Sequence, residues 1–244
     1  MAYTTIDNPE LYFQTKLYTG NGSTQSITLD GDEDMQPDFL WIKDRDNATS
    51  HQLVDVVRGS DEVLCADENY IQTTDSNRVS SLDADGFSVG SNSNVNTDTA
   101  NIVSWCWKES ATAGFDIVGY TGNGTDDTDI AHSLSAVPHV IIVKNRTEAY
   151  GWNVYHHKNT SAPETDVLSL DTNAATYDTA NSWSDEAPTS SVFTLGSGNG
   201  VNKDTNALIA YLWTDIQGFS KFGSYSGNGN ADGAFIYTGF KPAF

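Results

Sequence analysis

Tyr120-Thr121-Gly122-Asn123-Gly124 occurs in closely related form at two other places in this chain. Tyr18-Thr19-Gly20-Asn21-Gly22 precedes it, and Tyr225-Ser226-Gly227-Asn228-Gly229 follows it. The three tyrosines are 102 and 105 residues apart, which is about the length of one small domain. Recurrence at such a spacing indicates tandem structural repeats. Because Asn-Gly is the strongest short signal for a tight turn between strands, each copy predicts a turn.

The sequence that follows the turn is also repeated. Residues 138–146 align without a gap with residues 37–45, and both segments contain the continuous apolar run of a strand buried on both faces. Farther on, residues 202–213 align with residues 96–107. Side chains alternate along a strand, and residues 102–107 and 208–213 within these segments are mainly apolar on both faces, so we expect a central strand in each repeat. Helical periodicity is weak throughout.

These patterns predict an all-β protein made of two tandem, pseudo-repeated antiparallel β-sandwich units. We expect residues 1–12 to form an N-terminal arm or edge strand, residues 13–113 the first unit and residues 114–244 the second. The second unit includes a shortened third copy at residues 218–244, so we expect each sandwich to take its first strands from the following repeat. Four aromatic residues of this copy are expected to close the second unit or dock on a neighbouring subunit, namely Phe235, Tyr237, Phe240 and Phe244.

The charge balance excludes several classes of partner. The 244 residues include 12 lysines and arginines against 33 aspartates and glutamates, which gives a net charge of −21. So acidic a chain repels phosphate backbones and anionic lipids, and we expect no nucleic-acid partner. No segment approaches the roughly 20 apolar residues of a membrane span, and the N-terminus lacks a basic region followed by an apolar run. We therefore expect neither membrane insertion nor a signal peptide.

One acidic loop begins like a calcium-binding loop. Asp30, Asp32 and Asp34 alternate as calcium ligands do, but the sixth position is Met35 instead of glycine and the twelfth is Trp41 instead of glutamate. A solvated acidic loop is the favoured interpretation, and an opportunistic cation site is the alternative. The two cysteines are too few for a disulfide framework and form no Cys-x-x-Cys pair.

A candidate contact surface combines aromatic and histidine side chains, namely Trp152, Tyr155, His156 and His157. The first repeat has no histidines at the matching positions, so the pair is not part of the shared framework. Adjacent histidines on a strand point to opposite faces and do not readily chelate one metal ion. Ordinary packing is the favoured interpretation, and contact with a sugar or a protein is the alternative, because aromatic residues often anchor binding surfaces.

Patterns of catalytic chemistry are missing from the sequence. The Gly-Asn-Gly turns lack the Lys-Ser/Thr pair and the helix of a phosphate-binding loop. No histidine has a spacing that implies a catalytic triad. We therefore expect a protein without enzymatic activity and without a cofactor.

Several motifs, taken in order, resemble those of a known family. The resemblance rests on residues 82–90, 95–96, 104–108, 114–124, 132–138, 142–146, 152–156, 222–225 and 239–242. In this order they resemble a poorly characterised repeat family of virion surface proteins from tailed bacteriophages, many of them marine. The resemblance covers roughly residues 82–244 well and residues 13–58 less strictly.

The resemblance implies sandwich units of the jelly-roll or concanavalin-like kind and a role as a capsid decoration, tail fibre or appendage protein. It implies synthesis in the host cytoplasm, a place on the virion surface, and contacts with other capsid or tail proteins as a homo-oligomer or multivalent array. Two alternatives stay open. One is a lectin-like module that binds host surface glycans, and the other is a glycan depolymerase, for which the sequence indicates no particular pair of carboxylates.

Overall fold

The computed structural model describes residues 4–242, and most of its regular structure is β-strand. The strands of the first repeat are β1 (Phe13–Thr19), β2 (Gln25–Ile27), β3 (Phe39–Asp44), β4 (Gln52–Asp55), β5 (Gly59–Cys65), β6 (Thr73–Thr74), β7 (Val79–Asp83), β8 (Gly86–Val89) and β9 (Asn101–Trp107). Those of the second repeat are β10 (Phe115–Thr121), β11 (Thr128–Ala131), β12 (Val140–Asn145), β13 (Asn153–His156), β14 (Asp166–Ser169), β15 (Tyr177–Asp178), β16 (Val192–Leu195) and β17 (Ala207–Trp213).

Short helical turns connect the strands. They are η1 (Pro9–Leu11), α1 (Ser93–Asn96), η2 (Pro163–Thr165), α2 (Ala180–Trp183) and α3 (Asn199–Asn202). Within residues 4–242, none of the helices has the length and apolar character needed to cross a membrane.

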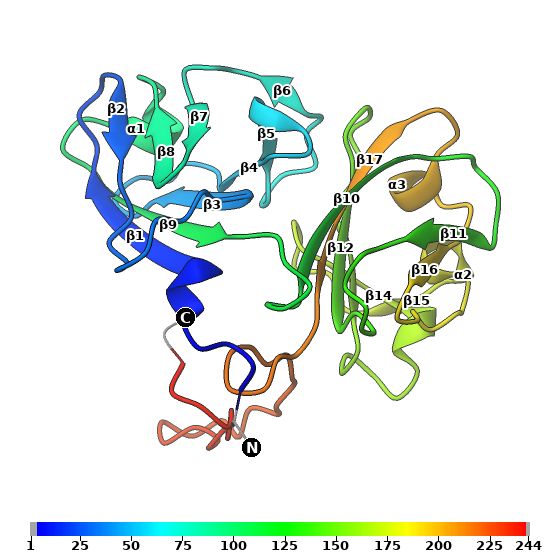
Figure 1. Cartoon of the computed structure of the whole chain (residues 1–244). Coiled ribbons are helices and arrows are strands. Elements are labelled where there is room, and N and C mark those ends of the chain that lie inside the picture. Colours follow the sequence, from blue (N-terminus) through cyan, green and yellow to red (C-terminus); the bar gives the residue numbers. More distant parts are fainter. Residues whose placement is uncertain (1–3, 243–244) are drawn as a thin grey trace.

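The strands form two similar units that lie side by side (Figure 1). In the described part of the chain, the first unit has a six-stranded sheet in the order β1-β9-β3-β4-β5-β6 and a three-stranded sheet in the order β2-β8-β7. The second unit has the matching sheet β10-β17-β12-β13-β14-β15 and the pair β11-β16. Neighbouring strands are antiparallel. The prediction of an all-β protein with two sandwich units is therefore confirmed.

Each unit is completed by its own first strand. β1 pairs with β9 from Phe13↔Trp107 to Thr19↔Asn101, and β10 pairs with β17 from Phe115↔Trp213 to Thr121↔Ala207. The prediction that each sandwich takes its first strands from the following repeat is wrong, because the first and last strands of one repeat are partners. β9 and β17 each lie between two neighbouring strands, as predicted for central strands.

Apolar cores lie within each unit and also between the units. Alternate side chains of β17 show why: Leu208, Ala210 and Leu212 pack inside the second unit, whereas Ile209 and Tyr211 pack against the first. The two six-stranded sheets therefore face each other, and the smaller sheets cover their outer faces. Since both faces of a large sheet are buried, its strands read as continuous apolar runs.

Buried charges accompany the apolar contact between the units. Arg58 and Asp55 form an ion pair with no exposed side-chain surface, Nε to Oδ2 2.5 Å, and the Tyr211 hydroxyl of the second unit donates to the same Asp55 oxygen at 2.6 Å. On the opposing sheet, the Lys144 ammonium donates to the Asn69 carbonyl at 3.1 Å. Burial lowers the pKa of Lys144 to about 8. These contacts tie the two units into one block.

The repeated turn is fixed by a buried asparagine. The Asn21 amide N–H donates to Asn96 Oδ1 at 2.9 Å, and the Asn123 N–H donates to Asn202 Oδ1 at 3.0 Å. Asn96 and Asn202 are fully buried. Their side-chain NH₂ groups also donate to backbone carbonyls of the same unit. A buried amide satisfied in this way fixes the position of the turn.

We expect Gly20→Ala to lower the free energy of unfolding by about 1–3 kcal/mol, because the backbone at this turn leaves no room for a side chain. A Cβ at Gly20 would lie 2.0 Å from the Thr97 carbonyl oxygen. The matching glycine of the third copy, Gly227, has nothing within 4 Å, so Gly227→Ala is the control. Urea denaturation measures both, and equal effects would contradict the close approach.

The third copy forms no strand within residues 218–242. Phe235 and Tyr237 are 89% and 73% exposed, and Phe240 is half-buried. Phe244 lies outside the described residues. The predicted closure of the second unit by this segment is therefore absent from the described structure, because β10 already occupies that edge position. Docking of the segment on a neighbouring subunit stays a prediction.

Candidate functional site

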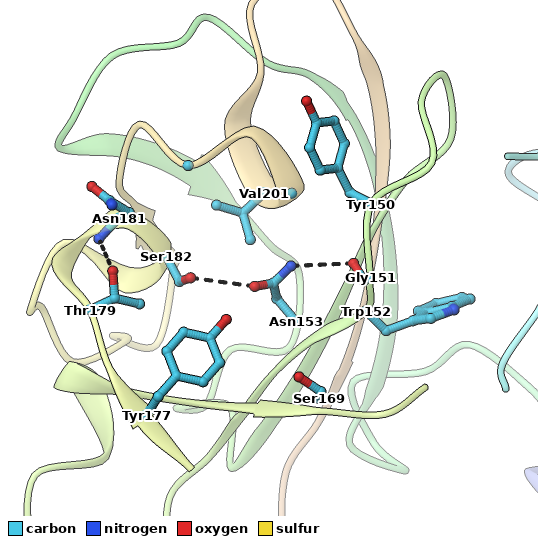
Figure 2. A pocket seen from close by; sticks show the side chains of 12 residues that line it. Tyr150, Gly151, Trp152, Asn153, Ser169, Tyr177, Thr179, Asn181, Ser182 and Val201 are labelled. Atoms are coloured by element: carbon cyan, nitrogen blue, oxygen red, sulfur yellow. Dashed lines mark hydrogen bonds between the residues drawn. The ribbon is translucent and has the colours of Figure 1, made fainter. Parts of the chain in front are cut away.

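A hollow of about 330 Å³ lies in the second unit, between strands β13 to β15 and the helical turns α2 and α3 (Figure 2). Its wall includes Asn153 on β13, Tyr177 on β15, Ser182 on α2 and Gly200 on α3. Ligand pockets in proteins measure roughly 300 to 1,000 Å³, so the hollow suits a small ligand or one end of a longer one.

The Asn153 amide lies at the centre of the hollow. Its Oδ1 accepts from the Ser182 hydroxyl at 3.4 Å, and its Nδ2 donates to the Gly151 carbonyl at 3.4 Å. Both distances exceed those of ordinary hydrogen bonds, so a ligand that offers shorter ones can compete for the amide. Figure 2 shows the Tyr177 hydroxyl pointing toward this pair, while the Tyr150 ring stands on the other side of the amide.

The hollow is uncharged although the chain is strongly acidic. The residues that line it offer amide, hydroxyl, phenol and backbone groups, and none of them carries a carboxylate or a basic group. The Asp171 carboxylate beside it is engaged with the backbone N–H of Trp152 at 3.0 Å. Such a site can hydrogen-bond an uncharged polar ligand and hold it against a ring, but its lining provides no acid–base or nucleophilic pair for catalysis.

The side chains of the candidate contact surface do not lie together at the protein surface. They are those of Trp152, Tyr155, His156 and His157. Trp152 and Tyr155 are 1% and 4% exposed, so they make no surface contact, and the favoured interpretation of ordinary packing holds for both. β13 has both faces covered, one by the first unit and one by the core of its own unit. The Trp152 indole donates to the carbonyl of Cys65 at 2.9 Å, and His156 and His157 are half-buried.

His157 instead belongs to a cluster with His139 and Asp215, which among residues 4–242 is the group of side chains closest to a metal-binding arrangement. The rings of His139 and His157 stack with centroids 3.9 Å apart and an interplanar angle of 6°. An imidazole binds metal in its own ring plane, and two parallel planes do not meet at one ion. His139 lies 3.0 Å from the Asp215 carboxylate and His157 contacts the Phe222 carbonyl, so the cluster fixes the loop after β17.

The acidic loop at Asp30, Asp32 and Asp34 is solvated. All three side chains are exposed, and Asp30 pairs with Lys16. Their carboxylates do not gather into a metal-binding group in the described part of the chain. This arrangement agrees with the favoured interpretation of a solvated loop.

Comparison with known proteins places the chain in a family. Residues 8–244 match the family described as a domain of unknown function, DUF7483. The chain belongs to the DUF7483 family. The match includes both sandwich units and the third copy of the turn. No curated protein and no solved structure matches the chain.

Where the linker between the units of this DUF7483 chain meets β10, two carboxyl groups form a pair. Glu109 shares a hydrogen bond with the buried carboxyl of Asp116, which also accepts from the backbone N–H and hydroxyl of Ser133 at 2.6 and 2.9 Å. Burial, followed by the neighbouring Asp116, raises the pKa of Glu109 to about 7 from its usual 4.5. The pair thus keeps one proton near neutral pH.

We expect Glu109→Gln to raise the free energy of unfolding at pH 8 by about 1 kcal/mol, allowing for solvent screening, and to change it little at pH 4.5. The folded protein binds this proton more tightly than the unfolded chain does, so the wild type loses stability as pH rises from about 4.5 to about 7. The glutamine side chain can donate the same hydrogen bond through its amide N–H, and it does not titrate in this pH range. Urea denaturation at both pH values measures the difference, with Glu186→Gln as the exposed control, and an equal gain at both would contradict the shared proton.

Sequence analysis did not single out Asn153, Tyr177 or Ser182 as a site. Tyr177 and Ser182 lie where the two repeats differ in length, so the sequence alignment does not pair them with first-repeat residues. The hydrogen-bonded pairing of the strands does identify the equivalent first-repeat residues of Tyr177 and Ser182.

Proposed function

We propose that this DUF7483 chain is a non-enzymatic structural protein of a bacteriophage particle, displayed on the capsid or tail surface as a decoration, fibre or appendage component. The sequence motifs support this proposal through their resemblance to phage virion proteins. The two units are in contact through a shared apolar core, and the chain carries a net charge of −21, which suits a protein that must stay soluble while many copies are displayed.

The observation that carries the proposal is the exposure of the third copy. In the two complete units, the turn tyrosines Tyr18 and Tyr120 donate to the carbonyls of Val95 and Val201, each at 2.7 Å. The matching Tyr225 is 71% exposed. The third copy thus presents side chains that the complete units bury. Exposed aromatic residues gathered in one segment favour contact with another protein.

We assign this contact to other capsid or tail proteins, including further copies of the chain. In an array, many modest contacts add up to firm attachment. Mass spectrometry of purified particles tests the location, and electron cryomicroscopy identifies the attachment point. Absence of the chain from washed particles would contradict the proposal.

The role of the third copy is tested separately. We expect a Phe235→Ala/Tyr237→Ala variant to be incorporated into particles at a lower level than the wild type. The matched control is Tyr70→Ala/Ile71→Ala, which removes exposed apolar side chains from the first unit. Equal incorporation of both variants would place the attachment elsewhere.

Two alternatives make different predictions. A lectin-like module that binds host glycans is favoured by the uncharged hollow of the second unit, and it predicts stoichiometric binding of the purified protein to host cells. A glycan depolymerase predicts release of oligosaccharides from host polysaccharide. The Glu109 and Asp116 carboxyls share a hydrogen bond, so this pair is closer than the roughly 5–5.5 Å of retaining glycosidases.

A further inference from the structure

We propose that the hollow of the second unit is a binding site for a neutral carbohydrate, and that the first unit lacks this site because its own side chains fill it. The inference rests on a comparison of the two repeats within one chain. It is independent of the particle role, because a glycan site can exist on a protein displayed anywhere.

Backbone pairing defines the matching positions. The Gly90 N–H donates to the Arg78 carbonyl at 3.0 Å, and the Gly196 N–H donates to the Ser182 carbonyl at 3.1 Å. Arg78 and Ser182 therefore occupy equivalent places. In the same way, the Asn92 N–H donates to the carbonyl of the residue before Arg78 at 3.0 Å. The Gly198 N–H donates to the carbonyl of the residue before Ser182 at 2.8 Å.

In the first unit, the Arg78 guanidinium occupies the place of the hollow. Its Nη1 donates to Gln52 Oε1 at 2.6 Å, and its Nε pairs with the Asp75 carboxylate at 3.1 Å. The Asn92 side chain donates to the same carboxylate at 2.9 Å. A charged, hydrogen-bonded network thus fills the position in the first unit that is equivalent to the hollow.

The second unit has shorter, uncharged side chains at all of these positions. Serine replaces Arg78, threonine replaces Asp75, asparagine replaces Gln52 and glycine replaces Asn92. The central amide, Asn153, keeps the position of Gln52 but loses its guanidinium donor. In place of that donor, its Oδ1 accepts the long contact from the Ser182 hydroxyl. The donor that Asn153 lacks is what a ligand hydroxyl can supply.

Aromatic rings are added to the same site. Tyr177 pairs with Val167 on β14 as Thr73 pairs with Val63 on β5, so a tyrosine stands where the first unit has threonine. Tyr150 replaces Thr49 in the loop between the matching strands. The second unit has therefore lost a charge network and gained two rings around one polar amide.

This combination selects a class of ligand. A sugar ring has hydroxyl groups that exchange hydrogen bonds with amides and hydroxyls, and it has C–H faces that pack on aromatic rings. The hollow contains no basic group to balance an anion, and the chain carries a net charge of −21. Acidic glycans are therefore disfavoured, and a neutral saccharide fits.

The test is a microarray of neutral glucose-, galactose- and mannose-containing oligosaccharides, printed together with sialylated and sulfated ones. We expect the wild type to bind a subset of the neutral glycans. Ser182→Arg restores the arginine of the first unit and is expected to abolish binding, whereas Ser190→Arg adds the same charge at an exposed position and should leave it intact.

A second variant covers the case in which Ser182→Arg fails to fold. Tyr177 is exposed at the rim, so Tyr177→Ala should fold normally and weaken binding of the same glycans about 5- to 30-fold, measured by titration calorimetry. Three results would overturn the proposal: no glycan bound by the wild type, binding to acidic glycans alone, or binding that survives both Ser182→Arg and Tyr177→Ala. Localisation of the chain on the particle would be unaffected by any of them.

Discussion

Asp55→Ala is expected to lower the free energy of unfolding by about 3–5 kcal/mol, because it leaves the Arg58 guanidinium buried without a counter-charge. Asp55 and Arg58 have no exposed side-chain surface, and they lie where the two large sheets meet. The same carboxylate accepts the Tyr211 hydroxyl of the second unit, so its loss also removes a contact between the units. Urea denaturation followed by tryptophan fluorescence measures the effect.

Two further variants separate charge from packing. Asp55→Ala/Arg58→Met replaces both partners with apolar side chains and should recover a large part of the loss, since no unpaired charge remains. Tyr211→Phe removes only the hydroxyl and should cost about 1–2 kcal/mol. Asp232→Ala, at an exposed position, is the control for the change in net charge. If the double variant were less stable than Asp55→Ala, the unpaired charge would not be the cause.

Trp152→Ala is expected to cost about 3–5 kcal/mol, because a fully buried indole is removed from the contact between the units. Trp152 belongs to the second unit, but its Nε1 donates to the carbonyls of Cys65 and Glu68 in the first, at 2.9 and 3.1 Å. The Lys144 ammonium lies 5.9 Å from the centre of its ring. Truncation would therefore leave a cavity and remove the indole donor from both carbonyls.

The form of the unfolding transition gives an independent readout. If Trp152 holds the units together, calorimetry of Trp152→Ala should show the units unfolding in two steps rather than in one. Trp152→Phe keeps a ring and loses only the N–H donor, so its cost should be nearer 1–2 kcal/mol. Tyr225→Ala, which removes an exposed ring, should change neither quantity. A stable, single-step Trp152→Ala protein would contradict the assigned role.

The repeat pattern predicted much of the fold because turns and buried strands depend on residues that are close together in the sequence. The Gly-Asn-Gly copies form turns, and the apolar runs at residues 39–44 and 101–107 form strands buried on both faces. Strand partnership was predicted wrongly, since the choice between the partner at the end of the same repeat and one in the next repeat depends on contacts distant in sequence. β1 and β9 meet only when the whole first repeat has folded.

The candidate site was less predictable than the fold. Trp152 and Tyr155 left two interpretations open, ordinary packing and a contact surface, because aromatic side chains occur in both settings. They are buried because a second large sheet covers the outer face of β13, and the spacing of residues along one strand carries no information about that sheet. Tyr177 and Ser182 were not predicted as site residues because neither belongs to a recognisable motif. Their possible role becomes visible only when they are compared with the equivalent residues Thr73 and Arg78 of the first unit.

The amino-acid sequence by itself determined the all-β class, the two repeats, the turns and the acidic charge balance, because these depend on composition and on periodicities of a few residues. The tertiary structure decided which faces are covered and which are open. Packing of two large sheets buried Trp152 beside the first unit, and the strands and helical turns around Ser182 enclose a hollow in the second unit. Burial and cavities are sums over residues distant in the chain, so they arise only when the layers are assembled.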